Sequence, residues 1–311
     1  MTSAEPSTPF FSVVICTYNR APLVPRAIRS VLEQTFTDFE LVVVDDGSTD
    51  ATGEVVSAIP DRRLRYVHRD NGGLSAARNT GVANARGRFV IFLDDDDEAL
   101  PDWLRLLYEA LDGDTRAVVT CGDMIVDEDA RVLRVRVPTP LGPAFANHRA
   151  RFVSGTFALP REAYHLAGGF AEDLECSHQT EFALRVLPMY RSRGWPVRSV
   201  DDPLIRHVLR SPERRIKTPE KILRGTKYIL AHHEDQLSRS PRVLADYLAV
   251  AGVAAARTGD YREARRLLRR AAITFRRDRT HRLRLVLAHF PPLANLVWKA
   301  RRYRRSPAAP A

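Results

Sequence analysis

Four consecutive aspartates, Asp94 to Asp97, follow the apolar run of residues 89–93. A helix N-terminus explains one or two acids at such a position, because its dipole stabilises negative charge. Four adjacent carboxylates repel one another, and a hard divalent cation such as Mg²⁺ or Mn²⁺ relieves that repulsion. The run therefore predicts a metal site, in which Asp97 is expected to do no more than cap the next helix.

A second acidic cluster, Asp45-Asp46, ends another apolar run. A carboxylate there could accept a hydrogen bond from a nucleobase or from a ribose hydroxyl. The following residues, 48–50, also suit a turn and a helix N-cap, so a purely structural interpretation stays open. A third polar cluster, residues 17–19 (TYN), follows the first apolar run of the chain.

Residues 71–81 (NGGLSAARNTG) predict a loop that runs into a helix of small residues. Small residues permit close approach to a ligand, and Arg78 could reach a diphosphate. Tight packing of the helix on a sheet explains the same residues without a ligand. Neither a G-x-G-x-x-G fingerprint nor a P-loop occurs in the chain, which argues against a nicotinamide enzyme and against an ATPase of the P-loop class.

Strands and helices alternate along the first part of the chain, and they set the positions of these residues. Short apolar runs predict strands over residues 11–17, 40–44, 64–67 and 89–93. Helices are expected from Pro22, from about Asp50, over 74–85 and around 104–111. Such βαβ units form an α/β fold with a mainly parallel sheet and helices on both faces. Because ligands bind beyond the carboxyl ends of the strands, the three polar clusters should share one rim.

The pattern after residue 117 is mixed and then becomes helical. We expect strands at 118–120 and 131–137, and helices at 161–167 and 180–187. Beyond residue 210, the segment 247–275 predicts two helices broken at residues 258–260. Its pattern A-x-x-x-G-D-Y-x-x-A resembles a single tetratricopeptide-like hairpin.

Charge is distributed unevenly, so the net charge of +10 describes neither part of the chain. Residues 1–205 contain 22 Lys and Arg against 30 Asp and Glu, whereas residues 206–311 contain 26 against 8. Three interpretations of the basic tail stay open: a solvated helical surface, an anionic membrane surface contacted by residues 283–305, and nucleic acid. For the membrane, Phe290, Leu293 and Trp298 would insert shallowly. No nucleic-acid motif occurs, so we expect no nucleic-acid partner.

Composition places the chain among ordinary folded proteins, with 44% apolar residues. No signal peptide or transmembrane run is recognisable, and the three cysteines have neither disulfide nor metal-ligand spacing. The expected location is the cytoplasm, with a peripheral position on the inner face of the cell membrane as the alternative. Residues 1–9 are expected to be disordered.

Five stretches together resemble the inverting glycosyltransferase family 2, which has the GT-A fold. They occur in the family's order and spacing, and the resemblance spans roughly residues 10–190. The stretches are residues 12–20 (SVVICTYNR), 34–50 (QTFTDFELVVVDDGSTD), 71–81, 87–97 (GRFVIFLDDDD) and 154–170 (SGTFALPREAYHLAGGF).

The resemblance implies a role for each residue of the rim. Donor binding would fall to Cys16, Tyr18, Asn19, Asp46, Arg78, Asp94 and Asp95. Asp94 and Asp96 would be the ends of a D-x-D motif that holds Mn²⁺ or Mg²⁺ on the diphosphate of a nucleotide sugar. A general base would deprotonate the acceptor hydroxyl, and a single displacement would invert the anomeric carbon.

This sequence departs from the family at the position of the base. The family commonly places an acidic pair about eight residues after Gly-Gly-Phe, where this chain has His178-Gln179. Three alternatives stay open: the base is His178, the base is a neighbouring acid (Glu175 or Glu181), or the chain has no functional base.

The expected function is transfer of a sugar from a nucleotide-diphosphate sugar to a glycan, a lipid-linked intermediate or another cell-surface polysaccharide precursor. The alternative is a catalytically weak or inactive nucleotide-sugar-binding scaffold that acts through its helical C-terminus. The expected domains are a nucleotide-sugar-binding half (10–112), an acceptor-side half (113–210) and a basic α-helical region (211–311).

Overall fold

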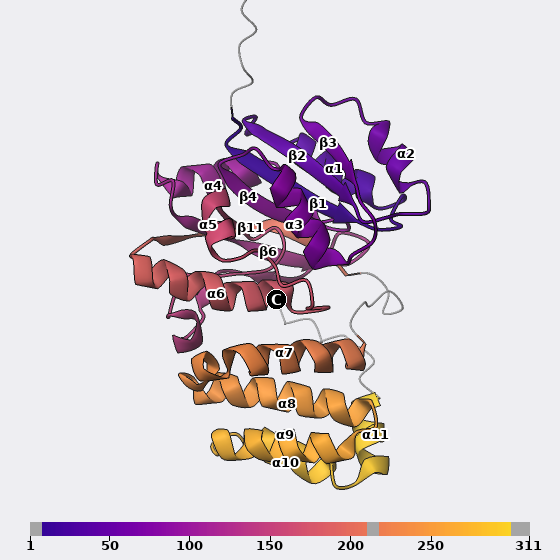
Figure 1. Cartoon of the computed structure of the whole chain (residues 1–311), viewed down its shortest axis with the longest axis vertical. Coiled ribbons are helices and arrows are strands. Elements are labelled where there is room, and N and C mark those ends of the chain that lie inside the picture. Colours follow the sequence, from indigo (N-terminus) through magenta and orange to yellow (C-terminus); the bar gives the residue numbers. More distant parts are fainter. Residues whose placement is uncertain (1–7, 210–217, 300–311) are drawn as a thin grey trace, which may run out of the picture. The chain divides into compact units, whose positions relative to one another are not determined.

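The computed structural model describes residues 8–209 and 218–299, and the chain forms two compact units, residues 1–214 and 215–311 (Figure 1). Residues 1–7 of the expected disordered N-terminus lie outside the described residues. So do residues 300–305 of the proposed membrane-contacting segment.

In the described part of the first unit, nine strands form one sheet with the order β3-β2-β1-β4-β10-β6-β11-β5, in which β7 pairs with β6. The four predicted strands are confirmed, and they are neighbouring and parallel. They are β1 (Phe11–Thr17), β2 (Phe39–Asp45), β3 (Leu64–His68) and β4 (Phe89–Asp94). Neighbours among them pair without register shifts, so their carboxyl ends meet at one edge.

The rest of the sheet is more irregular than the sequence predicted. Of the predicted strands, β6 (Val118–Val126) is longer than expected, and β7 (Val132–Arg136) is an antiparallel partner of β6. The sequence missed β10 (Phe157–Pro160), which is short, and β11 (Val197–Val208), in which two register shifts near Pro203 interrupt the apolar alternation. The two-residue β5 (Glu98–Ala99) pairs with β11. A separate two-stranded sheet is formed by β8 (Thr139–Pro140) and β9 (Arg149–Ala150), and the 3-10 helix η1 (Pro143–Phe145) lies between these two strands in the chain.

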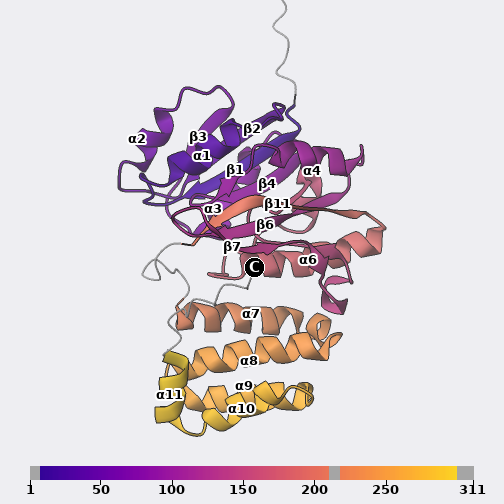
Figure 2. The same ribbon diagram turned by 180° about the vertical axis from the view of Figure 1, so that it is seen from behind.

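Helices cover both faces of this sheet (Figures 1 and 2). One apolar cluster contains buried residues of α1 (Val24–Leu32), α2 (Thr52–Ser57) and α4 (Trp103–Leu111). The cluster on the other face contains residues of α3 (Leu74–Asn84), α5 (Arg161–Leu166) and α6 (His178–Arg193). This mixed sheet with helices on both faces confirms the expected fold class.

Close packing explains the small residues of α3. A Cβ at Gly81 would lie 2.3 Å from Val14 Cγ1, a distance that no side chain tolerates. Ala77 is fully buried in the same layer. Small residues therefore let α3 approach β1 closely, and this approach fixes where the polar residues of α3 emerge.

The second unit consists of five helices among its described residues. They are α7 (Pro219–Ser238), α8 (Pro241–Arg257), α9 (Tyr261–Thr274), α10 (Arg279–Leu287) and α11 (Pro291–Lys299). The predicted break at residues 258–260 is confirmed, and Asp260 caps α9 by accepting a hydrogen bond from the backbone of Glu263 at 2.9 Å. Within residues 8–209 and 218–299, no helix is long and apolar enough to span a bilayer.

One expectation about this unit is wrong. In the membrane interpretation of the tail, Trp298 inserts together with Phe290 and Leu293, yet Trp298 is only 8% exposed. Burial of its large apolar ring contributes to the stability of a small helical unit. Phe290 and Leu293 are 57% and 47% exposed.

Candidate active site

The three polar clusters meet at one edge of the sheet, as their positions at strand ends predicted. Thr17 on β1 lies opposite Asp45 on β2, and Cys16 lies opposite Asp94 on β4. The backbone N–H of Asp46 donates to the carbonyl of Thr17 at 2.9 Å. The sheet register therefore sets the spacing between the clusters.

Asp94 is held by a buried arginine. Arg78 Nη2 donates to Asp94 Oδ1 at 2.8 Å, and the Arg78 side chain is 2% exposed whereas that of Asp94 is 38% exposed. Burial opposes ionisation of Asp94, but the charges of Arg78 and His207 and a hydrogen bond from Ser154 together outweigh it and lower the pKa of this carboxyl. Asp94 is therefore an anion with one face open to solvent.

Arg78 also connects the rim to the start of α6. With the amide of Gln179 turned so that its oxygen faces the guanidinium, that oxygen accepts from Arg78 Nη2 and Nη1 at 2.9 and 3.1 Å. The guanidinium carbon lies 5.2 Å from the ring centre of Phe170. Arg78 is thus enclosed by Asp94, Gln179 and Phe170, and its guanidinium connects the end of β4 with the start of α6.

The remaining aspartates of the run have different surroundings. Asp95 is buried, and burial raises its pKa to about 7. Asp96 has a side chain that is 36% exposed, and its nearest cation is Arg20 Nη1 at 3.8 Å. Asp94 and Asp96 therefore present exposed carboxylate oxygens, whereas Asp95 faces inward.

Asp97 does not cap a helix, contrary to expectation. Helix α4 begins only at Trp103, after Asp102. Asp97 instead lies 2.5 Å from His207 Nδ1 on β11, while burial raises the pKa of Asp97 to about 6. His207 Nε2 lies 3.3 Å from Asp123, which is fully buried on β6.

His207 is a residue of the site that no sequence signal indicated. It lies 110 residues from Asp97 and follows a polar stretch in which no strand was expected. Pairing of β11 with β5 and β6 brings it beside the acidic run.

Asp46 organises the loop that precedes α3. Its Oδ1 accepts from Arg69 Nη1 at 2.8 Å and from the backbone of Gly72 at 3.0 Å, and its Oδ2 accepts from the backbone of Gly73 at 2.8 Å. Asp45 is similarly engaged, by the backbone of Ser48 and the hydroxyl of Tyr66. These contacts support the structural interpretation of the cluster and leave its donor-binding role a prediction.

The residues after β1 line a shallow hollow. Asn19 has a positive φ of 51°, and its side-chain oxygen accepts from the backbone of Thr49 at 2.7 Å. Asn19, Arg20, Pro22 and Leu23 line a pocket of about 390 Å³. Tyr18 is 48% exposed at the same strand end. Cys16 is partly buried, and burial raises the pKa of its thiol to about 12, so it remains a neutral thiol.

The three base candidates differ in their surroundings. Glu181 is 2% exposed and pairs with Arg185, whose Nε and Nη2 lie 2.7 and 2.6 Å from its two oxygens. A carboxylate held in this way is a poor proton acceptor. His178 is the first residue of α6, next to Gln179, and is 8% exposed, whereas Glu175 is exposed. These surroundings weaken the case for Glu181 and leave the roles of His178 and Glu175 predictions.

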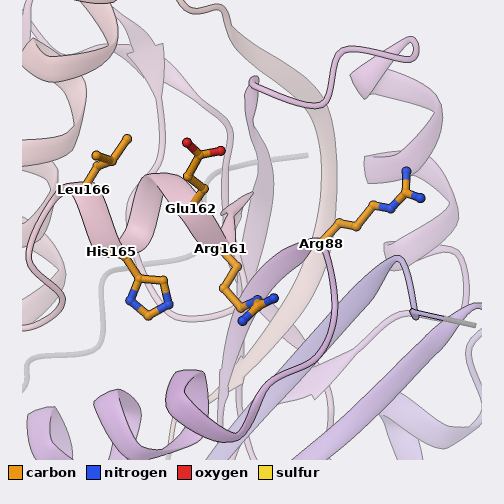
Figure 3. Close-up of a pocket in the computed structure, with 5 residues that line it drawn as sticks. All are labelled: Arg88, Arg161, Glu162, His165 and Leu166. Atoms are coloured by element: carbon orange, nitrogen blue, oxygen red, sulfur yellow. The ribbon is translucent and has the colours of Figure 1, made fainter. Parts of the chain in front are cut away.

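A second pocket lies away from the rim. Arg88, Arg161, Glu162, His165 and Leu166 line a hollow of about 560 Å³ (Figure 3). Arg88 precedes β4, and Arg161 follows β10, whose Pro160 pairs with Phe89. This pocket is therefore at the amino end of β4, whereas the acidic run is at its carboxyl end.

Together, the mixed sheet and the acidic rim define a protein of the GT-A class. The chain belongs to glycosyl transferase family 2, because residues 12–170, about half of its length, match that family. This match confirms the resemblance seen in the sequence.

Curated relatives agree with this assignment. The succinoglycan biosynthesis protein ExoO of Rhizobium meliloti is 40% identical over 154 residues, which are 47% of this chain and 44% of that protein. The putative colanic acid biosynthesis glycosyl transferase WcaA of Escherichia coli is 28% identical over 245 residues, which are 76% of this chain and 85% of that protein. The chain thus spans less than half the length of ExoO and most of WcaA.

Solved structures share the fold. The crystal structure of S. aureus TarS 1-349 in complex with UDP-GlcNAc matches with a TM-score of 0.60 and 18% identity, covering 95% of this chain and 93% of that one. At this identity the likeness concerns the fold alone, and it confirms the GT-A architecture.

Proposed function

We propose that this protein is an inverting glycosyltransferase that moves a sugar from a nucleoside-diphosphate sugar to a precursor of a cell-surface polysaccharide. The observation that carries the proposal is the Arg78–Asp94 pair, which holds an ionised carboxylate at the rim where three strands of the family's fold end. The names of ExoO and WcaA support a polysaccharide precursor, either a glycan or a lipid-linked intermediate, as the acceptor. The UDP-GlcNAc held by TarS makes UDP-sugars the first donors to test.

The residues of the acidic run fit a divalent cation. Asp94 is ionised, and Asp96 has an exposed carboxylate whose closest cation is 3.8 Å away. Oxygen ligands of this kind, completed by water and phosphate, are what Mg²⁺ and Mn²⁺ prefer. When bound, the ion would stabilise negative charge on the departing diphosphate.

The chain's own residues perform the remaining steps. Arg78 fixes the orientation of Asp94, and Gln179 couples both to the start of α6. His178 then takes the proton of the acceptor hydroxyl as this oxygen attacks the anomeric carbon. Because attack occurs opposite the departing diphosphate, one displacement inverts the configuration.

A second candidate function is a scaffold that binds a nucleotide sugar without transferring it. The specific observation in its favour is the replacement of the family's acidic pair by His178-Gln179, together with the engagement of Glu181 by Arg185. Such a protein would act through its helical unit. Turnover by purified protein separates the two functions.

The exposed surface of α10 and α11 suggests where in the cell the enzyme acts. Exposed apolar side chains on and between α10 and α11 accompany the arginines of α10, which suits shallow insertion into an anionic bilayer. The exposed apolar residues are Leu283, Val286, Phe290, Leu293, Leu296 and Val297. The proposal is a cytoplasmic enzyme that docks on the inner face of the cell membrane, where lipid-linked acceptors are present.

The decisive experiment combines donor binding with turnover. Purified full-length protein is screened against nucleotide sugars with Mn²⁺, and a true donor raises the apparent stability by about 2.7 kcal/mol at a hundredfold excess over its dissociation constant. Asp96→Asn should abolish Mn²⁺-dependent donor binding and turnover while leaving the unfolding temperature of the ligand-free protein unchanged, because its side chain is 36% exposed.

The matched control is Glu109→Gln, which changes an exposed acid on α4 that pairs only with Arg105 in the described structure. It should retain full turnover. Full activity of Asp96→Asn would overturn the metal assignment. Donor binding without any release of nucleoside diphosphate would favour the scaffold.

A further inference from the structure

The helical unit contains a cluster of one histidine and two aspartates from separate segments. Asp246 lies on α8, Asp278 immediately precedes α10, and His281 lies in the first turn of α10. One ligand atom from each lies within 4.8 Å of the others. Figure 2 shows α8, α9 and α10 packed in this unit, and α10 contacts both α9 and α8.

His281 is buried without a hydrogen bond. Its side chain is 1% exposed, and neither ring nitrogen has a hydrogen-bond partner among the residues that the structure describes. Leaving a buried polar group unpaired costs on the order of 1–3 kcal/mol, so native structures rarely contain one without a reason. The imidazole of His281 is therefore buried without a hydrogen bond that offsets the cost of its desolvation.

The ring points at the two carboxylates. His281 Nε2 lies 3.5 Å from Asp246 Oδ1 and 3.7 Å from Asp278 Oδ2. Both distances exceed those of good hydrogen bonds between nitrogen and oxygen. A tetrahedral ion bound at about 2.0–2.2 Å holds its ligand atoms about 3.3–3.6 Å apart. The two distances from His281 Nε2 are close to this range, and all three ligand atoms lie within 4.8 Å of one another.

The other contacts of the two carboxylates leave these oxygens available. Asp278 Oδ1 accepts from the backbone of Thr280 at 2.7 Å, so the capping role occupies Oδ1 and leaves Oδ2 facing His281. The side chain of Asp246 is 53% exposed, which admits water as a further ligand. The cluster is thus closed on the protein side and open on the solvent side.

We propose that Asp246, Asp278 and His281 bind a transition-metal ion of the zinc type, with water completing the coordination. One imidazole and two carboxylates suit Zn²⁺ better than Mg²⁺ or Ca²⁺, which take oxygen ligands. The ion would join α8 to the start of α10 and thereby hold the end of the helical unit together. Nothing in this role involves the acidic run of the first unit.

The experiment uses metal-stripped full-length protein carrying Asp96→Asn, which weakens any binding at the acidic run, in buffer containing excess Mg²⁺. Calorimetric titration with Zn²⁺ should show one site, and the unfolding temperature of the helical unit should rise with Zn²⁺. Replacement by Co²⁺ should give the strong visible absorption of a tetrahedral site.

Asp246→Asn and Asp278→Asn, added separately, should each weaken Zn²⁺ binding at least tenfold and abolish the Zn²⁺-dependent stabilisation. Both variants preserve shape, and Asn at 278 can still cap α10. The control is Asp235→Asn, which changes an exposed acid on α7 and should bind Zn²⁺ like its parent. Absence of a zinc site in the parent, or equal binding by both variants and parent, overturns the proposal in favour of a simple ion pair of His281 with two carboxylates.

Discussion

Arg78 and Asp94 form an ion pair of 2.8 Å at the end of β4, in which the arginine is buried and the aspartate faces solvent. Through Gln179 the same guanidinium reaches the first turn of α6. One buried cation therefore links the strand end expected to carry the metal with the helix expected to carry the base.

Arg78→Met should lower both stability and turnover. The substitution leaves Asp94 without its counter-ion, and we expect a loss of about 2 kcal/mol, less than for a fully buried pair because Asp94 can be hydrated. Urea denaturation measures the loss. Adding Asp94→Asn should restore part of the stability and none of the turnover.

The matched control is Arg105→Met. Arg105 pairs with Asp102 and Glu109 on the exposed face of α4, where all three side chains are at least 40% exposed. Its removal should change stability by no more than about 0.5 kcal/mol. Equal losses for the two arginine variants would mean that the Arg78–Asp94 pair has no special role.

The base is identified by comparing His178→Ala with Glu181→Gln. If His178 is the base, its removal should lower kcat by about 10²–10⁴ while donor affinity stays unchanged. Since the imidazole must be neutral to accept a proton, kcat/KM of the wild type should fall as the pH falls. Glu181→Gln should chiefly lower the unfolding temperature, because it breaks the pair with Arg185.

A different pattern would reassign the base. Wild-type kcat in His178→Ala, with a large loss in Glu175→Gln, would make Glu175 the proton acceptor. Stopped-flow or steady-state kinetics with the identified donor separates these cases.

Glu263 gives a pH-dependent contribution to the stability of the helical unit. Hydrogen bonds from Arg266 lead the causes that lower its pKa from 4.5 to about 2, and Lys227 Nζ lies 3.0 Å away. A lowered pKa means that the contribution is complete above pH 4.5 and disappears as the pH falls toward 2. After allowance for solvent screening, we expect Glu263→Gln to cost about 1 kcal/mol at about pH 7.

Thermal unfolding from about pH 7 down to about pH 3 tests this expectation. The difference between wild type and Glu263→Gln should narrow below pH 4.5. Asp235→Asn, at an exposed position on α7, serves as the comparison. A gap that stays constant over this range would exclude ionisation of Glu263 as its cause.

Membrane docking predicts that the exposed apolar side chains of α10 and α11 bind anionic vesicles. Phe290→Ser combined with Leu296→Ser should weaken binding by about 2 kcal/mol, or ~30-fold, since these side chains are 57% and 68% exposed. Vesicle co-sedimentation measures the affinity, which should also fall with added salt.

Two comparisons make that test specific. Ile273→Ser changes an equally exposed apolar residue on α9 and should leave binding intact. Removal of residues 283–311 should abolish binding. Equal affinity of the truncated and full-length proteins would refute the membrane role.

The sequence by itself determined the first half of the sheet and the rim. The runs at 11–17, 40–44, 64–67 and 89–93 are apolar and β-rich, so local composition is enough to specify buried parallel strands. Once those strands are parallel, the residues that follow them must lie at the same edge. Strand direction alone therefore places the acidic run, Asp46 and Thr17 together.

Only the tertiary structure decided what surrounds each carboxylate. His207 reaches Asp97 because β11 pairs across 110 residues with strands near the acidic run, and an irregular polar strand has no periodic signal. Arg78 is buried because Gly81 lets α3 approach β1, a packing contact between distant segments. In the helical unit, His281 meets Asp246 only when α10 folds back on α8. Local patterns determine which elements form, whereas long-range packing determines which charges become buried and what they contact.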